Sequence, residues 1–288
     1  MNNEIVDKLK ISIESSSINK SSYWKKYSNS KTDYLNPSSD LGFGSYYKKT
    51  LLSVVIHFIF LSYFFGRNLF KLTIYKKYKL LFDKSKRQID LNATRHIFTF
   101  DLLKKRIKTP SKVCIIGDGK CHSVIGSIVT FPNAKIFSIN LPETLINDYL
   151  VLRRMNILDD AEIQVIESED DEILENKKLI LIPSHLKNNL LNKHIDLFVN
   201  IASFQEMTTN EIANYFEIIK SNNSVFYCCN REYKKLDGGE QLYFENYPWG
   251  EAKFHLKENC PWHYKYYCRK FPFIKKYNGI TKHCLVSY

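Results

Sequence analysis

The clearest pattern of hydrophobic and polar positions runs from Lys112 to Glu143 and predicts a strand, a turn, a helix and a second strand. Residues 113–116 form a continuous apolar run, short enough for a strand that is buried on both faces. Apolar positions follow helical spacing over 121–131, and residues 135–141 form a second apolar run. Two strands joined in this way indicate a right-handed crossover in a parallel sheet, whose ligands bind at the carboxyl ends of the strands.

The later part of the chain continues the alternation of strand and helix. Thr208 and Glu211 have the spacing of a capping box and predict the start of a helix. The acidic run 167–172 is expected to begin a solvated helix. Further strands are predicted at 163–166, 178–183, 195–201, 224–229 and 283–287. Either of the first two can take third place in the sheet, and the last is expected to pair with 264–268 or to form an edge.

This alternation predicts an α/β fold, a Rossmann-like, doubly wound, mostly parallel sheet with helices on both faces and an N-terminal helical extension. Within the extension, Leu51–Phe65 is a run of fifteen uncharged residues, shorter than the about 20 apolar residues of a spanning helix. We predict a buried core helix there, with an in-plane membrane contact as the alternative. Basic amphipathic helices are predicted at 68–82 and 93–108, and an ordered loop at 34–44.

The charge is unevenly distributed along the chain. Residues 1–112 carry 22 Lys and Arg against 8 Asp and Glu, whereas residues 113–288 carry 20 against 22. We therefore predict a basic, mainly helical region at 1–110 that packs on a sheet domain at 111–288. A basic surface can bind nucleic acid, anionic lipid or an acidic substrate, but solvated lysine faces explain the charge more simply. We expect no nucleic-acid partner and keep a peripheral membrane contact of the basic region as the alternative.

The seven cysteines and the eight histidines show no metal-ligand or disulfide spacing. The number of cysteines is odd and no C-x-x-C occurs, which indicates neither a disulfide framework nor a zinc knuckle. We expect free thiols, a reducing cytoplasm and no bound metal. Residues 1–20 lack the apolar core of a signal peptide.

A glycine turn, Gly117-Asp118-Gly119, follows the first strand directly. The dinucleotide fingerprint needs a third glycine or an alanine three residues later, and His122 occupies that position. A nucleoside without a pyrophosphate, such as S-adenosylmethionine, is less demanding, since it needs a close backbone turn and an acceptor for the ribose on the second strand. An ordinary packing turn of an α/β domain remains the other interpretation of the two glycines.

Several segments resemble, in the same order, the sugar O-methyltransferases that bacteria use to methylate surface-polysaccharide sugars. The similar segments are 22–24, 41–43, 139–143, 200–207, 226–230 and 247–249. The resemblance covers about residues 20–250, and 203–207 is its most specific part. It implies a class I methyltransferase fold with S-adenosylmethionine over the first two strands. The family's second strand ends in Asp-Leu-Pro-Glu, whose acid holds the ribose hydroxyls, whereas this chain has the uncharged Asn140 there.

Residues at the predicted strand ends are the candidate site. The candidate cofactor ligands are Gly117, Asp118, Gly119, Asn140, Leu141, Ser184, Asn200 and Ser203. The candidate substrate ligands are Gln205, Asn230, Arg231, Tyr247 and Trp249. A sugar hydroxyl is a poor nucleophile, so a base should assist its attack.

Glu206 is our first choice for that base, with His122 and His185 as alternatives. Each candidate base also has a plainer interpretation, Glu206 as a surface or capping residue and the two histidines as structural residues. Likewise, Tyr247 and Trp249 can simply pack their loop on the domain. Three functions follow: a sugar O-methyltransferase, an RNA- or lipid-directed methyltransferase, or a non-enzymatic binding protein that keeps the fold.

Overall fold

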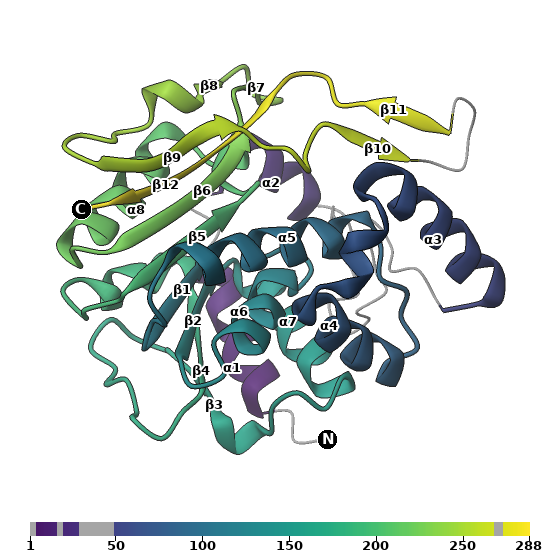
Figure 1. The fold of residues 1–288 in the computed structure, drawn as a ribbon. Helices are drawn as coiled ribbons and strands as arrows, with labels where there is room; N and C mark the ends of the chain where they lie inside the picture. Colours follow the sequence, from purple (N-terminus) through teal and green to yellow (C-terminus); the bar gives the residue numbers. More distant parts are fainter. Residues whose placement is uncertain (1–3, 16–19, 29–48, 268–272) are drawn as a thin grey trace.

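The computed structural model describes residues 4–15, 20–28, 49–267 and 273–288 of the 288-residue chain. A central sheet carries helices on both faces (Figure 1). The loop predicted at 34–44, the similar segment 41–43 and Cys268 lie outside the described residues.

The main sheet has eight strands in the order β3-β4-β2-β1-β5-β6-β12-β9. Its strands are β1 (Lys112–Ile116), β2 (Lys135–Asn140), β3 (Ile163–Val165), β4 (Leu179–Pro183), β5 (Leu197–Ile201), β6 (Val225–Arg231), β9 (Lys253–Asn259) and β12 (Thr281–Ser287). The first six strands in that order pair in parallel, whereas β12 is antiparallel to both β6 and β9. The predicted fold class is therefore confirmed.

The structure decides between the two candidates for third place in the sheet, and it corrects the prediction about the last strand and the one about the acidic run. The apolar run 178–183 takes third place in the sheet, and β3 pairs outside it as an edge strand. β12 lies between β6 and β9 and pairs with both, so it neither forms an edge nor pairs with 264–268. Residues 265–267 instead form β10 (Lys265–Tyr267), which pairs with β11 (Ile274–Lys276). The acidic run does not begin a helix, because Asp171 accepts hydrogen bonds from the backbone N–H groups of Glu167 and Ser168 and closes a turn. A further hairpin joins β7 (Tyr233–Lys235) to β8 (Gln241–Tyr243).

The helices divide between the two faces of the sheet, each with its own apolar core. The α-helices are α1 (Glu4–Ser15), α2 (Ser22–Ser28), α3 (Leu51–Phe65), α4 (Thr73–Lys84), α5 (Leu91–Arg106), α6 (His122–Thr130), α7 (Pro142–Arg154) and α8 (Thr209–Ser221). The 3-10 helices are η2 (Arg67–Lys71), η3 (Asp160–Glu162), η4 (Ser184–Leu190), η5 (Phe204–Glu206) and η6 (Phe244–Asn246). Buried side chains of α4 to α7 form one core, and those of α8 form the other. Thr208 caps α8 by accepting a hydrogen bond from the Glu211 N–H at 3.3 Å, in agreement with the predicted helix start.

Three of the N-terminal helices, α1, α4 and α5, pack closely on the first of these faces. α4 and α5 pack against α6, and α1 packs against α7 (Figure 1). The Lys20 ammonium forms a buried ion pair with Glu143, at the start of α7, at 2.7 Å. The basic region therefore completes a core that the sheet shares.

The prediction of a buried core helix at Leu51–Phe65 is wrong. Only His57 and Leu61 of α3 are buried, whereas Leu51 and Leu52 are 84% and 69% exposed. Figure 1 shows α3 at the edge of the molecule, next to the β10–β11 hairpin. No helix among the described residues combines the length and the apolar character needed to cross a bilayer.

Candidate active site

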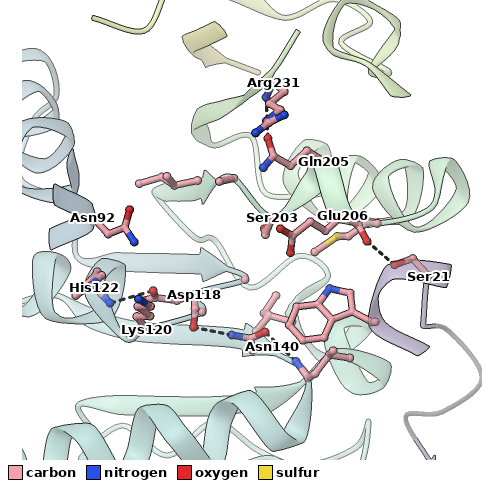
Figure 2. Close-up of a pocket in the computed structure, with 18 of the residues that line it drawn as sticks. Ser21, Asn92, Asp118, Lys120, His122, Asn140, Ser203, Gln205, Glu206 and Arg231 are labelled. Carbon is pink, nitrogen blue, oxygen red and sulfur yellow. Dashed lines mark hydrogen bonds between the residues drawn. The ribbon is translucent and has the colours of Figure 1, made fainter. Parts of the chain in front are cut away.

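A cavity of about 270 Å³ opens where β1, β2, β4, β5 and β6 end at their carboxyl sides (Figure 2). The predicted residues that line it are Gly117, Asp118, Gly119, His122, Asn140, Leu141, Ser184, Ser203, Gln205, Glu206 and Arg231. Parallel strands bring their carboxyl ends to one edge, so residues far apart in the sequence meet there.

The turn after β1 lies directly against the loop after β5. Gly117 has a φ of +69°, a conformation that favours glycine, and its N–H donates to the Ile139 carbonyl at 2.9 Å. A Cβ at Gly117 would collide with the Ser203 side chain. The glycine is thus required both by the backbone conformation and by this close approach.

Asp118 turns its carboxylate toward the start of α6. The carboxylate accepts hydrogen bonds from the His122 and Val124 N–H groups at 3.0 and 2.8 Å. Burial raises the pKa of Asp118 to about 6, although these hydrogen bonds oppose the rise. Asp118 therefore fixes the helix against the turn, and its side chain is already bonded within the protein.

Asn140, at the end of β2, is tied to the same turn (Figure 2). Its Nδ2 donates to the Asp118 carbonyl at 3.1 Å, and its Oδ1 accepts from the Leu141 N–H at 3.0 Å. An amide can make both bonds, whereas a carboxylate can only accept. The amide thus joins the ends of β1 and β2 while it lines the cavity.

The segment 203–207 is anchored to β1, β5 and β6 by a buried hydrogen-bond network. Asn200 donates to the Ile116 carbonyl at 2.9 Å and accepts from Asn230 at 2.7 Å. Gln205 accepts from the Arg231 N–H at 2.9 Å. Asn200 and Asn230 were expected to contact ligands, but both are fully buried and do not line the cavity. Their side chains instead serve a structural role, because their hydrogen bonds join β1, β5 and β6 to the loop that carries Ser203.

Glu206 presents a half-buried carboxylate to the cavity. Its backbone carbonyl accepts a hydrogen bond from Ser21, which joins it to the N-terminal segment (Figure 2). Burial raises the pKa of Glu206 to about 8, although the charges of Lys234 and Arg231 oppose the rise. A carboxylate with a pKa near the working pH has the property expected of a general base.

The two histidine alternatives are placed less favourably. His122 is buried, and its ring centre lies 6.0 Å from that of Phe82 in a stacked arrangement. Neither ring nitrogen has a hydrogen-bond partner in the part of the chain that the structure describes. Burial lowers the pKa of His122 well below its ordinary value. His185 follows Ser184 in η4. Ser184 lines the cavity, whereas His185 does not. Glu206 remains the candidate whose acid group faces the open space.

Tyr247 and Trp249 were expected to bind the substrate, but neither lines the cavity. Both are buried in the core beside α8, where Trp249 lies 5.1 Å from Phe216. The Trp249 Nε1 donates to the Phe244 carbonyl at 3.0 Å, so its polar group is satisfied in the core. The plainer interpretation, packing of the loop, describes their position.

Other cavity residues were not predicted from the sequence. They include Lys20, Ser21 and Trp24 from the N-terminal segment, Asn92, Arg95 and His96 from α5, and His263 and Tyr277 from the C-terminal part. Polar residues on an amphipathic helix predict a solvated face, so α5 gave no sign that Arg95 is buried. The pairing of Lys20 with Glu143 was not predictable from any local pattern either, since the two residues are 123 positions apart.

The main sheet is thus Rossmann-like: one reversed strand, β12, lies between β6 and β9, and the cavity opens at the carboxyl ends of the parallel strands. No family profile and no curated protein matches the chain. Among solved structures, the chain is similar to M. capricolum TrmK in complex with S-adenosyl-homocysteine, with 11% identity, a TM-score of 0.38, and coverage of 66% of this chain and 67% of that one. It is also similar to coclaurine N-methyltransferase bound to N-methylheliamine and S-adenosyl-homocysteine, with 10% identity, a TM-score of 0.44, and coverage of 90% and 68%. These likenesses are distant, and the fold class rests on the strand order itself.

Proposed function

We propose that this protein is an S-adenosylmethionine-dependent O-methyltransferase that acts on a sugar hydroxyl of a surface polysaccharide or its precursor. The observation that carries the proposal is the cavity at the strand ends, with the Gly117 turn on one side and Glu206 on the other. The strand order supports the methyltransferase class, and the ordered sequence segments support the sugar acceptor.

The residues around the turn fit the cofactor. Gly117 and Gly119 bring bare backbone to the cavity, and Leu141, Ser184 and Ser203 line it alongside. Asn140 can accept one ribose hydrogen bond with the second lone pair of Oδ1. His122 in place of a third glycine argues against NAD. When bound, S-adenosylmethionine supplies a methyl group activated on a sulfonium.

Glu206 is proposed to orient the acceptor hydroxyl and to take its proton on the carboxylate. Among the described residues, no side chain donates a hydrogen bond to this carboxylate. It is therefore available to an acceptor, and the alignment of reacting groups is a large part of the rate in such displacements.

The acceptor side of the cavity supports a polyhydroxylated substrate. Asn92, Gln205 and Arg231 offer amide and guanidinium groups, which can hydrogen-bond sugar hydroxyls. The Tyr277 ring offers an apolar face, although Arg95 and Arg231 already lie 4.8 and 5.7 Å from its centre.

We also propose that α3 rests on an anionic membrane surface, where precursors of surface polysaccharides can be held. Ile59 and Tyr63 of α3 are 57% and 67% exposed, and burial of such side chains in the headgroup region is favourable. Arg67 flanks the helix, is exposed and supplies charge that anionic lipid attracts, whereas Lys49 at the other end is paired with Asp83 at 2.6 Å.

Binding of the cofactor is the first test. Isothermal calorimetry should detect S-adenosylmethionine and S-adenosyl-homocysteine and find weaker or no binding of NAD. Transfer of a labelled methyl group to nucleotide sugars and glycan fragments then tests the acceptor, with RNA and phospholipid as the competing acceptors. Tighter binding of NAD would reject the methyltransferase, and labelling of RNA alone would reject the sugar. Absence of cofactor binding would favour the alternative of a non-enzymatic binding protein. The uncharged Asn140, in the place of an acid that holds the ribose, is the feature that supports this alternative.

A further inference from the structure

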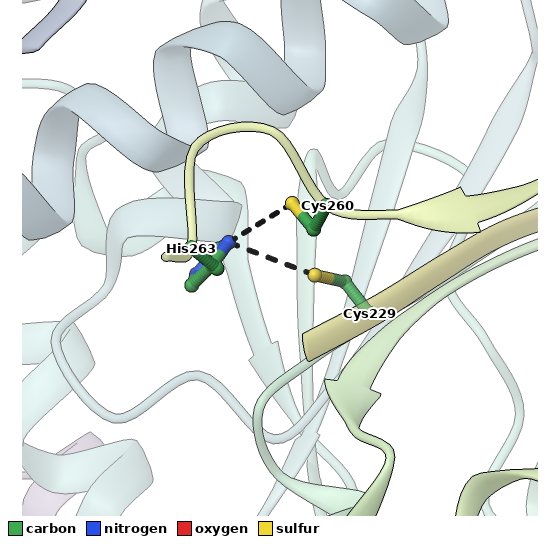
Figure 3. Close-up of side chains that lie close together, drawn as sticks. All are labelled: Cys229, Cys260 and His263. Atoms are coloured by element: carbon green, nitrogen blue, oxygen red, sulfur yellow. Dashed lines mark hydrogen bonds between the residues drawn. The ribbon is translucent and has the colours of Figure 1, made fainter. Parts of the chain in front are cut away.

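A buried cluster of two thiols and an imidazole lies beside the candidate active site (Figure 3). Cys229 belongs to β6, whereas Cys260 and His263 belong to the segment between β9 and β10. The three ligand atoms lie within 4.8 Å of one another. We propose that Cys229, Cys260 and His263 bind a zinc ion.

The distances match the geometry of tetrahedral zinc. Zn–S and Zn–N bonds of about 2.3 and 2.0–2.1 Å at a tetrahedral angle place sulfur and nitrogen about 3.6 Å apart. The His263 Nδ1 lies 3.2 Å from the Cys260 sulfur and 3.7 Å from the Cys229 sulfur. Both sulfurs thus face the same ring nitrogen, and small shifts suffice to place one ion between them.

The ligand types also select the metal. Thiolate and imidazole together suit zinc, whereas magnesium and calcium prefer oxygen ligands. The cluster holds no carboxylate among the described residues. A divalent ion would also unite two thiolates that otherwise repel each other when both are deprotonated.

The segment that carries two of the ligands is held firmly in place. The Cys260 N–H donates to the Thr281 carbonyl at 2.8 Å, and the His263 N–H donates to the Cys260 carbonyl at 3.3 Å. Arg95 donates to the carbonyls of Trp262 and Lys265 at 3.1 and 2.9 Å. These bonds fix the turn Cys260-Pro261-Trp262-His263 against α5 and β12, so the ligands are preorganised.

Three protein ligands leave one of zinc's four positions for a water molecule or another ligand. His263 lines the cavity that Glu206 also lines. The metal would therefore join the β9–β10 segment to β6 at the wall of the active site. This inference goes beyond methyl transfer and does not depend on it.

The sequence-based expectation of no metal overlooked this arrangement. Cys260 and His263 form a C-x-x-H pair, which is a local chelating pattern, but Cys229 lies 31 residues before Cys260 and joins it only through the pairing of β6, β12 and β9.

Metal analysis of the full chain tests the site. Protein purified without a histidine tag, under reducing conditions and from zinc-supplemented cells, should hold zinc at close to one ion per chain by mass spectrometry. Cobalt(II) added to the metal-free protein should give intense visible bands and a sulfur-to-cobalt charge-transfer band, which report tetrahedral thiolate ligation. Cys260→Ser and His263→Gln should each weaken zinc binding by more than about a hundredfold, because loss of mere second-shell partners already costs about 10–100-fold.

Cys284→Ser is the matched control, since Cys284 is also buried but belongs to the other core of the sheet. It should keep the zinc content and the cobalt spectrum of the wild type. Equal metal content in Cys260→Ser and the wild type would overturn the proposal. The wild-type cobalt spectrum decides the question even if a cluster variant does not fold: a spectrum without the charge-transfer band would overturn it.

Discussion

At the scale of single residues, Glu206 combines a cavity position with a raised pKa. If its carboxylate takes the acceptor proton, Glu206→Gln should lower turnover by about a hundredfold or more. Wild-type turnover should rise with pH and level off above about 8, because the base works in its deprotonated form. Affinity for S-adenosylmethionine should change little.

Glu217→Gln provides the matched control, because Glu217 is an exposed residue of α8. Steady-state rates over a range of pH, with an acceptor found by the screen, make the comparison. A Glu206→Gln enzyme with the rate and pH profile of the wild type would remove Glu206 from catalysis.

The same carboxylate predicts a pH dependence of stability. The pKa of Glu206 is raised from 4.5 to about 8, so between these values the folded state holds a proton that the unfolded state releases. The contribution of Glu206 is therefore most favourable below pH 4.5 and is lost as the pH rises to about 8.

Gln cannot ionise, so the melting temperature of Glu206→Gln, relative to that of the wild type, should increase as the pH rises through this window. Differential scanning fluorimetry from pH 5 to 9 measures the difference, and Asp118, whose pKa is raised in the same direction, cancels because both proteins contain it. Parallel curves for the two proteins would mean that the carboxylate is solvated.

Asn140 offers a test of the amide that stands where the similar sugar O-methyltransferases have an acid. Asn140→Asp removes the donor to the Asp118 carbonyl and adds an acid near Asp118, and burial already raises the pKa values of Asp118 and of the neighbouring Asp148. We expect a loss of about 1–3 kcal/mol in unfolding free energy at pH 8, the cost of an unsatisfied buried group. The loss should shrink at low pH, where the new acid is protonated and can donate.

Urea unfolding at two pH values measures this effect, with the exposed Asn133→Asp as control. Calorimetry on the same variant tests the ribose contact separately, since a carboxylate facing the ribose should tighten binding. Unchanged stability at pH 8 would show that the hydrogen bond from Asn140 to the Asp118 carbonyl does not stabilise the fold.

Many of the residues that the sequence proposes for the site line one cavity, but the sequence could not rank them by role. Gly117, Asn140 and Ser203 were recognised because each follows a predicted strand, and strand ends meet at one edge. Asn200 and Asn230 satisfy the same rule but point into a hydrogen-bond network, which depends on pairing that no local pattern reveals.

At the scale of elements, α3 is the clearest difference between pattern and structure. A helix that is apolar all round is usually buried, and its charge-free sequence gives no polar face that would show its orientation. α3 packs mainly through its inner side, where His57 and Leu61 are buried and Phe60 stacks on Tyr267 at 4.8 Å. β9 was also missed, because its side chains are mostly exposed and form no apolar run.

The exposed face of α3 predicts binding to anionic membranes. The double variant Leu52→Glu, Ile59→Glu places two charges on the outer side of the helix and should lower the bound fraction in flotation with phosphatidylglycerol vesicles. Binding of the wild type should fall with added salt, because the exposed Arg67 beside the helix supplies part of the attraction.

Leu80→Glu on α4 is the control, since Leu80 is likewise 67% exposed but lies outside the proposed contact. It should float like the wild type, and none of the proteins should bind phosphatidylcholine vesicles strongly. A wild type that stays with the soluble fraction on anionic vesicles would rule out the contact.

At the scale of the whole molecule, the N-terminal region is both a structural support and a wall of the site. Residues 4–15 and 20–28 precede the sheet by about a hundred positions, yet α1 packs on α7, and Lys20, Ser21 and Trp24 line the cavity. The charge division at residue 112 indicated a boundary in the sequence, and packing shows that the core continues across it. Such long-range closure depends on buried contacts between distant residues, which periodicity does not record.

The Lys20–Glu143 ion pair is the most testable of these contacts. Its two side chains are only 6% and 4% exposed, so loss of the cation leaves the Glu143 carboxylate without its ammonium partner inside the protein. Lys20→Met should therefore lower the unfolding free energy by about 3–5 kcal/mol. Combining it with Glu143→Gln should recover much of the loss, because the buried charge is then removed as well.

Lys8→Met is the matched control, because Lys8 pairs with Glu167 at 2.8 Å but is half-exposed, and surface pairs contribute only about 0–1 kcal/mol. Urea unfolding gives the energies, and calorimetry on folded protein gives the cofactor affinity. Since residues 20–24 line the cavity, Lys20→Met should also weaken S-adenosylmethionine binding, whereas Lys8→Met should not. If Lys20→Met unfolds and binds like Lys8→Met, the Lys20–Glu143 pair neither stabilises the fold nor contributes to cofactor binding.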